Sequence, residues 1–329
     1  MANIICSTII PTIGRSSLTR AVNSVLSQDI NQDEFEVIVV NDSGKPLAAE
    51  YWMKSPRVII LHTNQQNRSV ARNTGAGIAQ GKYFHFLDDD DWILPGMFQQ
   101  LQKRTKIEAE TGWVYGGFRL VNNDGEMIKE FHPTEAGNCF IHMMASEWIP
   151  LQASWIASDA FFAVGGFAPL HSLGGGYEDI DLARLIARHY EFTRVPETVA
   201  VIRYGDTGST TDYKNLVKQN RLSREKSLES PGAFRRMWES TPSSGEVSNY
   251  WHGQIIYYYL VSFVWNVKQK NLLKATNHLF LAFLAFVLSF RYVFSSDFWR
   301  GVIYPHHNLV RVTLEAEKKH LFTRTVWER

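Results

Sequence analysis

The stretch that decides the fold is Tyr83-Phe84-His85-Phe86-Leu87-Asp88-Asp89-Asp90-Asp91-Trp92, in which an apolar run ends in four carboxylates. The run is too short for a helix and rich in aromatic residues, so it predicts a buried β-strand. Four like charges at the end of a strand repel one another unless a cation lies between them. Because Mg²⁺ and Mn²⁺ prefer oxygen ligands, the four carboxylates predict a metal site. The alternative is an acidic first turn of the next helix, which the helix dipole would favour.

Strand-like and helix-like segments alternate around this stretch. The predicted strands cover residues 4–10, 35–40, 58–61 and 83–87. One helix is expected over 16–27, and Ser69 is expected to cap a second helix that contains Arg72. Strands separated by short helices imply a parallel sheet, and ligands bind at the carboxyl ends of its strands. Polar residues follow three of the predicted strands, at Pro11-Thr12, at Asp42 and at Asp88–Asp91.

The composition is that of an ordinary globular protein, with 45% hydrophobic and 20% charged residues, so wholesale disorder is excluded. A net charge of +1 argues against a nucleic-acid partner held by a broad basic surface. The two cysteines, Cys6 and Cys139, form neither a metal-binding spacing nor a disulfide framework, which fits a reducing compartment. The N-terminus has no basic lead-in of a signal peptide, so we expect a cytoplasmic location.

Two polar residues near predicted strand ends are candidates for binding a nucleotide. Asp42 can accept hydrogen bonds from a base N–H or from ribose hydroxyls; the alternative is an Asx-turn within Asn41-Asp42-Ser43-Gly44. Arg72 lies near a helix start, where backbone N–H groups favour anions, and the alternative is a surface arginine. No phosphate-binding GxxxxGK[ST] loop or GxGxxG follows the first strand, so an ordinary ATPase or a dinucleotide dehydrogenase is not indicated.

Several short motifs occur in order along the first two-thirds of the chain. They are Pro11-Thr12, Val39-Val40-Asn41-Asp42-Ser43, Ala71-Arg72-Asn73-Thr74-Gly75, Phe86-Leu87-Asp88-Asp89-Asp90-Asp91, Val164-Gly165-Gly166-Phe167 and Gly176-Tyr177-Glu178-Asp179-Ile180-Asp181-Leu182. In this order and spacing the set resembles the family 2 glycosyltransferases of the GT-A fold. The resemblance implies an α/β, Rossmann-like domain with a mainly parallel central sheet and flanking helices. It also implies an inverting transferase that uses a nucleotide-sugar donor.

The resemblance also implies roles for the donor-side residues. Pro11, Thr12, Asp42 and Arg72 fall where the family holds the nucleotide, which is usually uridine, so the implied donor is a UDP-sugar. Residues 88–90 match the DXD motif of the family. Asp90 is the implied ligand of a divalent Mn²⁺ or Mg²⁺, with Asp88 as a second contact, and Asp88 and Asp89 lie nearer the ribose.

On the acceptor side, the resemblance places a general base at Asp179 and acceptor contacts at Glu178 and Gly166. Glu178 is expected to raise the proton affinity of Asp179 by like-charge coupling. The alternative for this pair is an ordinary acidic start of the helix 180–188. One departure concerns a histidine that family members often carry after the last strand of the domain. Residues 203–208 contain none, and Arg203 or Asp206 is a candidate substitute.

The C-terminal third has a different character. We expect a transferase domain over residues 1–212 and a mostly helical extension over 213–329, with a linker at 241–245. The apolar run 279–290 is shorter than the ~18–20 residues that cross a bilayer. Three alternatives remain open for residues 255–294: packing on the transferase domain, a homodimer interface, or a helix lying on the membrane surface between basic residues.

These observations together predict a metal-dependent, inverting glycosyltransferase. We expect it to act in the cytoplasm on a saccharide or lipid-linked acceptor, in polysaccharide or glycoconjugate synthesis. Contact with the inner face of the membrane stays one of the alternatives for residues 255–294. Two alternatives stay open. One is a catalytically inactive scaffold that binds nucleotide sugars. The other is a sugar nucleotidyltransferase, which Gly14-Arg15-Ser16-Ser17 matches poorly because such enzymes need a glycine-rich basic loop there.

Overall fold

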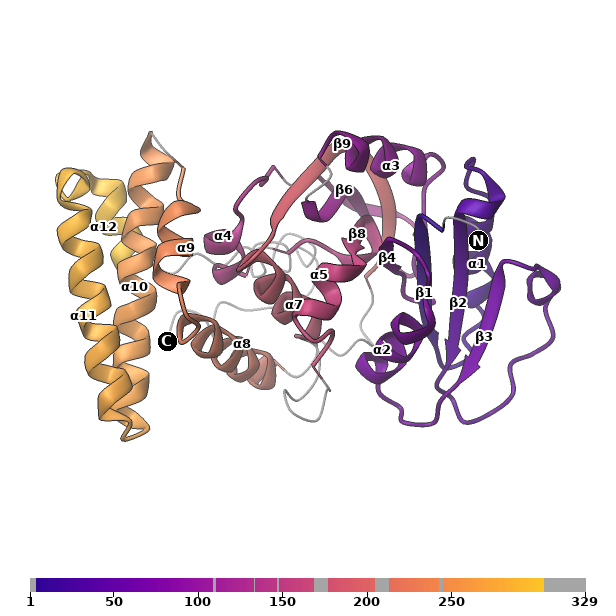
Figure 1. The fold of residues 1–329 in the computed structure, drawn as a ribbon, viewed down its shortest axis with the longest axis horizontal. Coiled ribbons are helices and arrows are strands. Elements are labelled where there is room, and N and C mark those ends of the chain that lie inside the picture. Colours follow the sequence, from indigo (N-terminus) through magenta and orange to yellow (C-terminus); the bar gives the residue numbers. More distant parts are fainter. Residues whose placement is uncertain are drawn as a thin grey trace. The chain divides into compact units, whose positions relative to one another are not determined.

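The computed structural model describes most of the chain, as two compact units (Figure 1). The described residues are 4–108, 111–132, 134–146, 148–168, 177–204, 213–242 and 245–304. Within them, the first unit comprises residues 4–137 and 149–219, and the second comprises 138–148 and 220–304. The predicted boundary at residue 212 remains a prediction.

The first unit is built on one mixed β-sheet. Its parallel half has the order β3-β2-β1-β4, formed by β1 (Cys6–Thr12), β2 (Phe35–Asn41), β3 (Val58–His62) and β4 (Tyr83–Phe86). These are the four strands that the sequence predicts, and all of β1, β2 and β4 is buried. Their carboxyl ends therefore meet at one edge of the sheet, as the polar motifs require.

Beyond β4 the sheet becomes mixed. It continues as β8-β6-β9-β5, with β7 paired to β6, and contains β5 (Trp92–Ile93), β6 (Thr111–Val121), β7 (Met127–Phe131), β8 (Ser154–Ala157) and β9 (Glu191–Arg203). β8 runs antiparallel to β4 and β6, whereas β9 runs parallel to β6. The mainly parallel sheet is therefore confirmed for its first half only. Three glycines weaken the sequence signal of β6, and β5 is only two residues long.

Helices connect the strands of the first unit. They are α1 (Leu18–Leu26), α2 (Arg68–Ile78), α3 (Met97–Ile107), α5 (Ser158–Ala163) and α7 (Glu178–Ala187). The expected cap at Ser69 is wrong, because α2 begins earlier. Asn67 is its N-cap, and the Asn67 side chain accepts hydrogen bonds from the backbone N–H groups of Ser69 (3.1 Å) and Val70 (3.3 Å). A buried asparagine thus fixes the start of the helix that carries Arg68 and Arg72.

The second unit is helical, as the sequence predicts. It contains α4 (Phe140–Met144), α9 (Ala233–Glu239), α10 (Glu246–Lys268), α11 (Leu272–Leu288), α12 (Ser296–Ile303) and the part of α8 (Tyr213–Leu228) that follows Gln219. Gly253 and Gly301 let α10 and α12 approach closely, because a Cβ at either position would lie within 2.2 Å of the other helix's backbone. Among the described residues, no helix has the length and apolar character needed to span a bilayer.

Replacing Asn67 with alanine tests the cap of α2. We expect Asn67→Ala to lower the free energy of unfolding by about 1 kcal/mol, because two backbone N–H groups lose their acceptor. Ser69→Ala is the matched control, since the buried Ser69 hydroxyl has no hydrogen-bond partner. Urea denaturation followed by circular dichroism checks both variants. A larger loss for Ser69→Ala than for Asn67→Ala would contradict the assignment of the cap.

Candidate functional site

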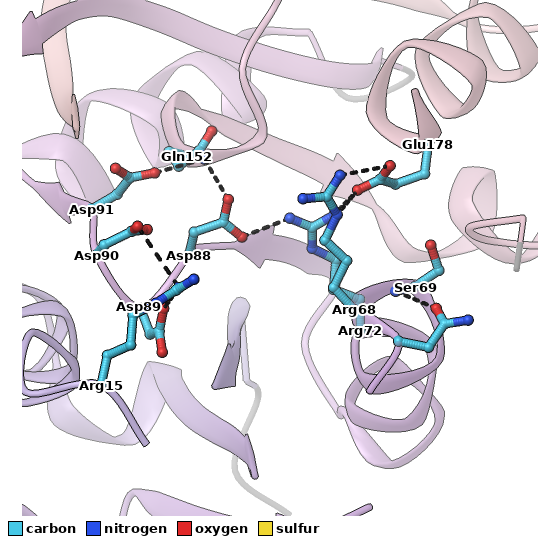
Figure 2. A network of polar contacts seen from close by, with 11 residues as sticks. Arg15, Arg68, Ser69, Arg72, Asp88, Asp89, Asp90, Asp91, Gln152 and Glu178 are labelled. Atoms are coloured by element: carbon cyan, nitrogen blue, oxygen red, sulfur yellow. Dashed lines mark hydrogen bonds and ion pairs between the residues drawn. The ribbon is translucent and has the colours of Figure 1, made fainter. Parts of the chain in front are cut away.

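The four carboxylates lie in the loop between β4 and β5, at the carboxyl edge of the sheet (Figure 2). They are not the first turn of the next helix, because α3 begins at Met97 and has no acidic residue there. That alternative is therefore wrong. Each of the four side chains has its own set of partners, so the loop is an organised cluster and not a solvated run of charge.

Asp89 and Asp91 are the two buried members of the cluster. Asp89 accepts a hydrogen bond of 2.5 Å from the Thr12 hydroxyl at the end of β1, and it pairs with the Arg15 guanidinium. Asp91 accepts from Gln152 Nε2 and from the backbone N–H of Arg203, both at 2.7 Å. Burial, together with the charges of Asp88 and Asp90, raises the pKa of Asp91 well above its usual value. These contacts fasten the loop to β1 and to β9.

Asp88 is joined to the second acidic motif through Arg72. One Arg72 amino group lies 2.6 Å from Asp88, and the other lies 3.1 Å from Glu178. Arg72 is only 3% exposed, so the alternative of a surface arginine is wrong. Burial favours the neutral form of Asp88, but Arg72 and Arg68 outweigh this and hold the pKa of Asp88 below its usual value. The arginine thus brings two motifs that lie 90 residues apart in the sequence to one place (Figure 2).

Asp90 has the most exposed side chain of the cluster. Its side chain is 35% exposed, and the Arg15 guanidinium lies 3.7 Å from Asp90 Oδ2. Burial and the neighbouring Asp88 raise the pKa of Asp90, which means that its ionised form is destabilised. A cation beside Asp90 would stabilise the ionised form.

The oxygen ligands at Asp88 and Asp90 fit a hard divalent cation. Among the described residues, no cluster of three or more histidine, cysteine, aspartate or glutamate side chains could hold a metal by itself. Mg²⁺ and Mn²⁺ commonly take only one or two protein carboxylates and complete their shell with water and substrate phosphates.

Glu178 and Asp179 open α7, and their pKa values are shifted in opposite directions. Glu178 is buried between Arg68 and Arg72, which outweigh the effect of burial and lower its pKa. Asp179 is half-buried, and burial together with the adjacent Glu178 raises its pKa to about 6. The pair does lie in an acidic first helical turn, as the alternative predicts. The helix start favours the ionised form of Asp179, but burial and Glu178 outweigh it, so the pKa of Asp179 is raised.

Asp42 and Thr12 both lie at the carboxyl edge of the sheet. Asp42 Oδ1 accepts from the Thr63 hydroxyl and from the Gln65 N–H, each at 2.7 Å, and Oδ2 accepts from the Asn67 N–H at 2.6 Å. The Asx-turn expected within residues 41–44 does form, but its side chain is that of Asn41, which accepts from the Ser43 N–H at 3.1 Å. Asp42 therefore holds the loop that leads into α2. Pro11 precedes Thr12 at the buried end of β1.

Gly166 lies in a turn with a φ of 68°, and a Cβ there would come within 2.8 Å of Asn73 Oδ1. Because the backbone approaches so closely, the Asn73 side chain makes two hydrogen bonds with Phe167. Its Nδ2 donates to the Phe167 carbonyl at 2.8 Å, and its Oδ1 accepts from the Phe167 N–H at 3.0 Å. The Arg72 guanidinium lies 5.2 Å from the centre of the Phe167 ring. Gly166 thus contributes to the packing around Arg72, while its expected contact with an acceptor remains a prediction.

Three further residues complete the cluster and are not among the residues predicted from the sequence: Arg15, Arg68 and Gln152. Gln152 Nε2 donates to both Asp88 (3.1 Å) and Asp91 (2.7 Å). Its backbone carbonyl lies 3.0 Å from Nε2 of the buried His85, whose pKa burial lowers to about 4, so His85 is neutral and donates this bond. The only signal for Gln152 is one amide inside the otherwise apolar run 149–153.

One expectation falls on a residue that the structure does not describe. Asp206, a candidate substitute for the missing histidine, lies outside the described residues. The other candidate, Arg203, is described, and its backbone N–H holds Asp91.

Comparison with known proteins identifies the type of domain. The family model described as Glycosyl transferase family 2 matches residues 7–170, a range that holds the acidic loop and Arg72. An uncharacterized glycosyltransferase of Haemophilus influenzae is 25% identical over 228 residues, which are 67% of this chain and 76% of that protein.

Shorter matches link the chain to two proteins of Bacillus subtilis. The uncharacterized glycosyltransferase EpsJ is 33% identical over 27% of this chain, and the minor teichoic acid biosynthesis protein GgaB is 36% identical over 26% of it. These matches span only 26% of EpsJ and 10% of GgaB.

The fold is similar to that of TarS from S. aureus. The crystal structure of TarS 1-349 matches with a TM-score of 0.54 at 13% identity, covering 84% of this chain and 90% of that one. The same fragment in complex with UDP-GlcNAc matches with a TM-score of 0.56 and the same coverage. At this identity the likeness concerns the fold alone: a curled α/β sheet with additional helices.

Removing the Gln152 amide tests how the acidic loop is held. We expect Gln152→Ala to lower the free energy of unfolding by about 1–3 kcal/mol, because the buried Asp91 loses a donor. Gln65→Ala is the control, since that side chain is exposed and should change stability by less than about 0.5 kcal/mol. Thermal and urea unfolding measure both. Equal stability of the two variants would show that Gln152 does not hold the loop.

Proposed function

The chain belongs to glycosyltransferase family 2, and from this premise we propose that it transfers a sugar from a nucleoside diphosphate to an acceptor hydroxyl, with inversion at the anomeric carbon. The observation that carries the proposal is the bridge from Asp88 through Arg72 to Glu178. It brings the carboxylates suited to a donor's metal close to the carboxylate suited to a base, Asp179. A transferase needs both beside one sugar.

The proposed donor is a UDP-sugar. Pro11, Thr12, Asp42, Arg72, Asp88 and Asp89 are the residues we assign to it. The complex of the TarS fragment with UDP-GlcNAc supports this donor class, because that protein shares the fold. Arg15 adds a half-exposed guanidinium beside Asp89 and Asp90. Such a group can pair with a diphosphate oxygen.

The proposed cofactor is Mn²⁺ or Mg²⁺, held by Asp90 with Asp88. When bound, a divalent cation neutralises the charge that develops on the departing diphosphate. The protein's own part is to keep Asp88 ionised through Arg72 and to leave Asp90 without a strong partner.

We assign the general base to Asp179. With a pKa of about 6, this carboxylate is ionised at neutral pH and can accept the proton of the acceptor hydroxyl. Glu178 cannot compete for that proton, because Arg68 and Arg72 hold it in the charged form. Inversion requires attack from the face opposite the diphosphate, so we place the acceptor on the side of Asp179, Glu178 and Gly166.

The acceptor is proposed to be a saccharide or a lipid-linked glycan. The match to a minor teichoic acid biosynthesis protein supports a role in polysaccharide or glycoconjugate synthesis. The proposed location is the cytoplasm, where the two free, buried cysteines Cys6 and Cys139 would stay reduced.

Removing the Asp90 carboxylate tests the metal-dependent donor site. Isothermal calorimetry with a UDP-sugar is expected to detect binding in Mn²⁺, and this binding should be lost in EDTA and in Asp90→Ala. Asp124→Ala is the control, because Asp124 is exposed and lies outside the cluster. Binding that is equally tight in EDTA would exclude a metal at Asp90. Failure of the wild type to bind any nucleotide sugar would contradict the proposed donor site.

The pH dependence of transfer tests the base. The wild-type rate should rise with pH through about 6, because the raised pKa keeps Asp179 protonated below that value. Asp179→Asn should keep donor binding but lose about 10²–10⁴ in rate together with this acidic limb. Rates over a range of pH, with calorimetry of the variant, check this. An unchanged rate in Asp179→Asn would remove Asp179 from the mechanism.

A further inference from the structure

The outward side of α11 (Leu272–Leu288) is apolar over its C-terminal half. Only Ala275, His278, Ala282 and Ala285 of this helix are buried. Every exposed side chain between residues 279 and 288 is a leucine, a phenylalanine or a valine. We call the following set the α11 face: Leu279, Phe280, Phe283, Phe286, Val287 and, just past the helix, Phe290. Contiguous apolar surface of this kind marks a site that something covers.

Basic residues border the α11 face at both ends. Lys268, Lys270 and Lys274 precede it, and Arg291 and Arg300 follow it, whereas α11 itself contains no aspartate or glutamate. Lys274 pairs with Glu229 and Arg300 pairs with Asp297. After these pairs are counted, the first end keeps the positive charges of Lys268 and Lys270, and the second end keeps that of Arg291. Trp299 and Tyr304, both exposed, add amphipathic rings beside the second basic end.

We propose that the α11 face docks on an anionic lipid surface. A helix with an apolar free side and cationic ends lies in the plane of the headgroups, with its apolar side chains about 5–10 Å deep. The lysine and arginine side chains reach the anionic headgroups from both ends, and tryptophan and tyrosine rings favour the same level. This mode needs no membrane-spanning helix, and none is found among the residues that the structure describes.

The charge pattern favours lipid over a second copy of this chain. If two α11 faces paired in parallel, each basic end would meet the same basic end of the other copy. If they paired antiparallel, Lys268 and Lys270 would meet Arg291. Either arrangement brings like charges together, which opposes association, whereas an anionic surface attracts both ends at once.

Vesicle co-sedimentation of the full chain tests this proposal. The protein should pellet with vesicles of phosphatidylcholine and phosphatidylglycerol in equal parts, and at least about tenfold less with phosphatidylcholine alone. The double variant Phe280→Ser/Phe283→Ser should bind at least about tenfold more weakly. Lys268→Gln/Lys270→Gln should weaken binding to the anionic vesicles by a similar factor. Ile107→Ser, an equally exposed apolar site in the first unit, should bind as the wild type does.

Three outcomes would overturn the proposal. The first is failure of the wild type to pellet with either vesicle. The second is binding that Phe280→Ser/Phe283→Ser leaves unchanged while circular dichroism shows both proteins folded. The third is a concentration-dependent dimer, measured by analytical ultracentrifugation without lipid, that this variant abolishes; a second copy would then cover the α11 face. Donor binding by calorimetry is independent of these results, so failure here leaves the proposed function untouched.

Discussion

The interaction on which the site depends is the buried bridge from Arg72 to Asp88 and Glu178. A buried guanidinium is costly unless carboxylates surround it, and buried carboxylates are equally costly without a cation. Each charged group is therefore stable in this position only with the others. The ion pairs of Arg72 with Asp88 and Glu178 hold the loop after β4 and the start of α7 together. Asp90 and Asp179 lie beside the bridge but are not neutralised by it as Asp88 and Glu178 are, and in both the pKa is raised. The bridge thus keeps Asp88 and Glu178 ionised.

The rest of the first unit explains why Arg72 lies where it does. Asp42 fixes the loop after β3 through three hydrogen bonds, and one of its donors, Asn67, then caps α2. On the other side, His85 bonds the carbonyl of Gln152, whose amide holds Asp88 and Asp91. Residues assigned to nucleotide binding from the motif pattern therefore also build the site. A loss of activity on mutating Asp42 would not by itself show contact with the donor.

Much of the first half could be predicted from the sequence, because its four parallel strands are short, apolar and followed by polar residues. The acidic loop at a strand end follows directly from residues 83–92. The antiparallel strands were harder: β6 carries three glycines and β5 has two residues, so neither shows a clear pattern. Within the site, Arg15 and Gln152 cannot be predicted from local pattern because their partners are distant in sequence. Local spacing alone does not say whether Asn67 or Ser69 accepts the bonds that cap α2.

The most direct test of a single displacement assisted by Asp179 as general base is the configuration of the sugar that the enzyme releases. Proton NMR can follow the slow hydrolysis of UDP-, GDP- and dTDP-sugars in Mn²⁺ and identify the first anomer formed. An inverting site predicts that one donor is hydrolysed and that its sugar appears first as the anomer opposite to that of the donor. Early appearance of the same anomer would contradict the single displacement. Absence of hydrolysis and of binding with every donor would contradict the transferase function itself.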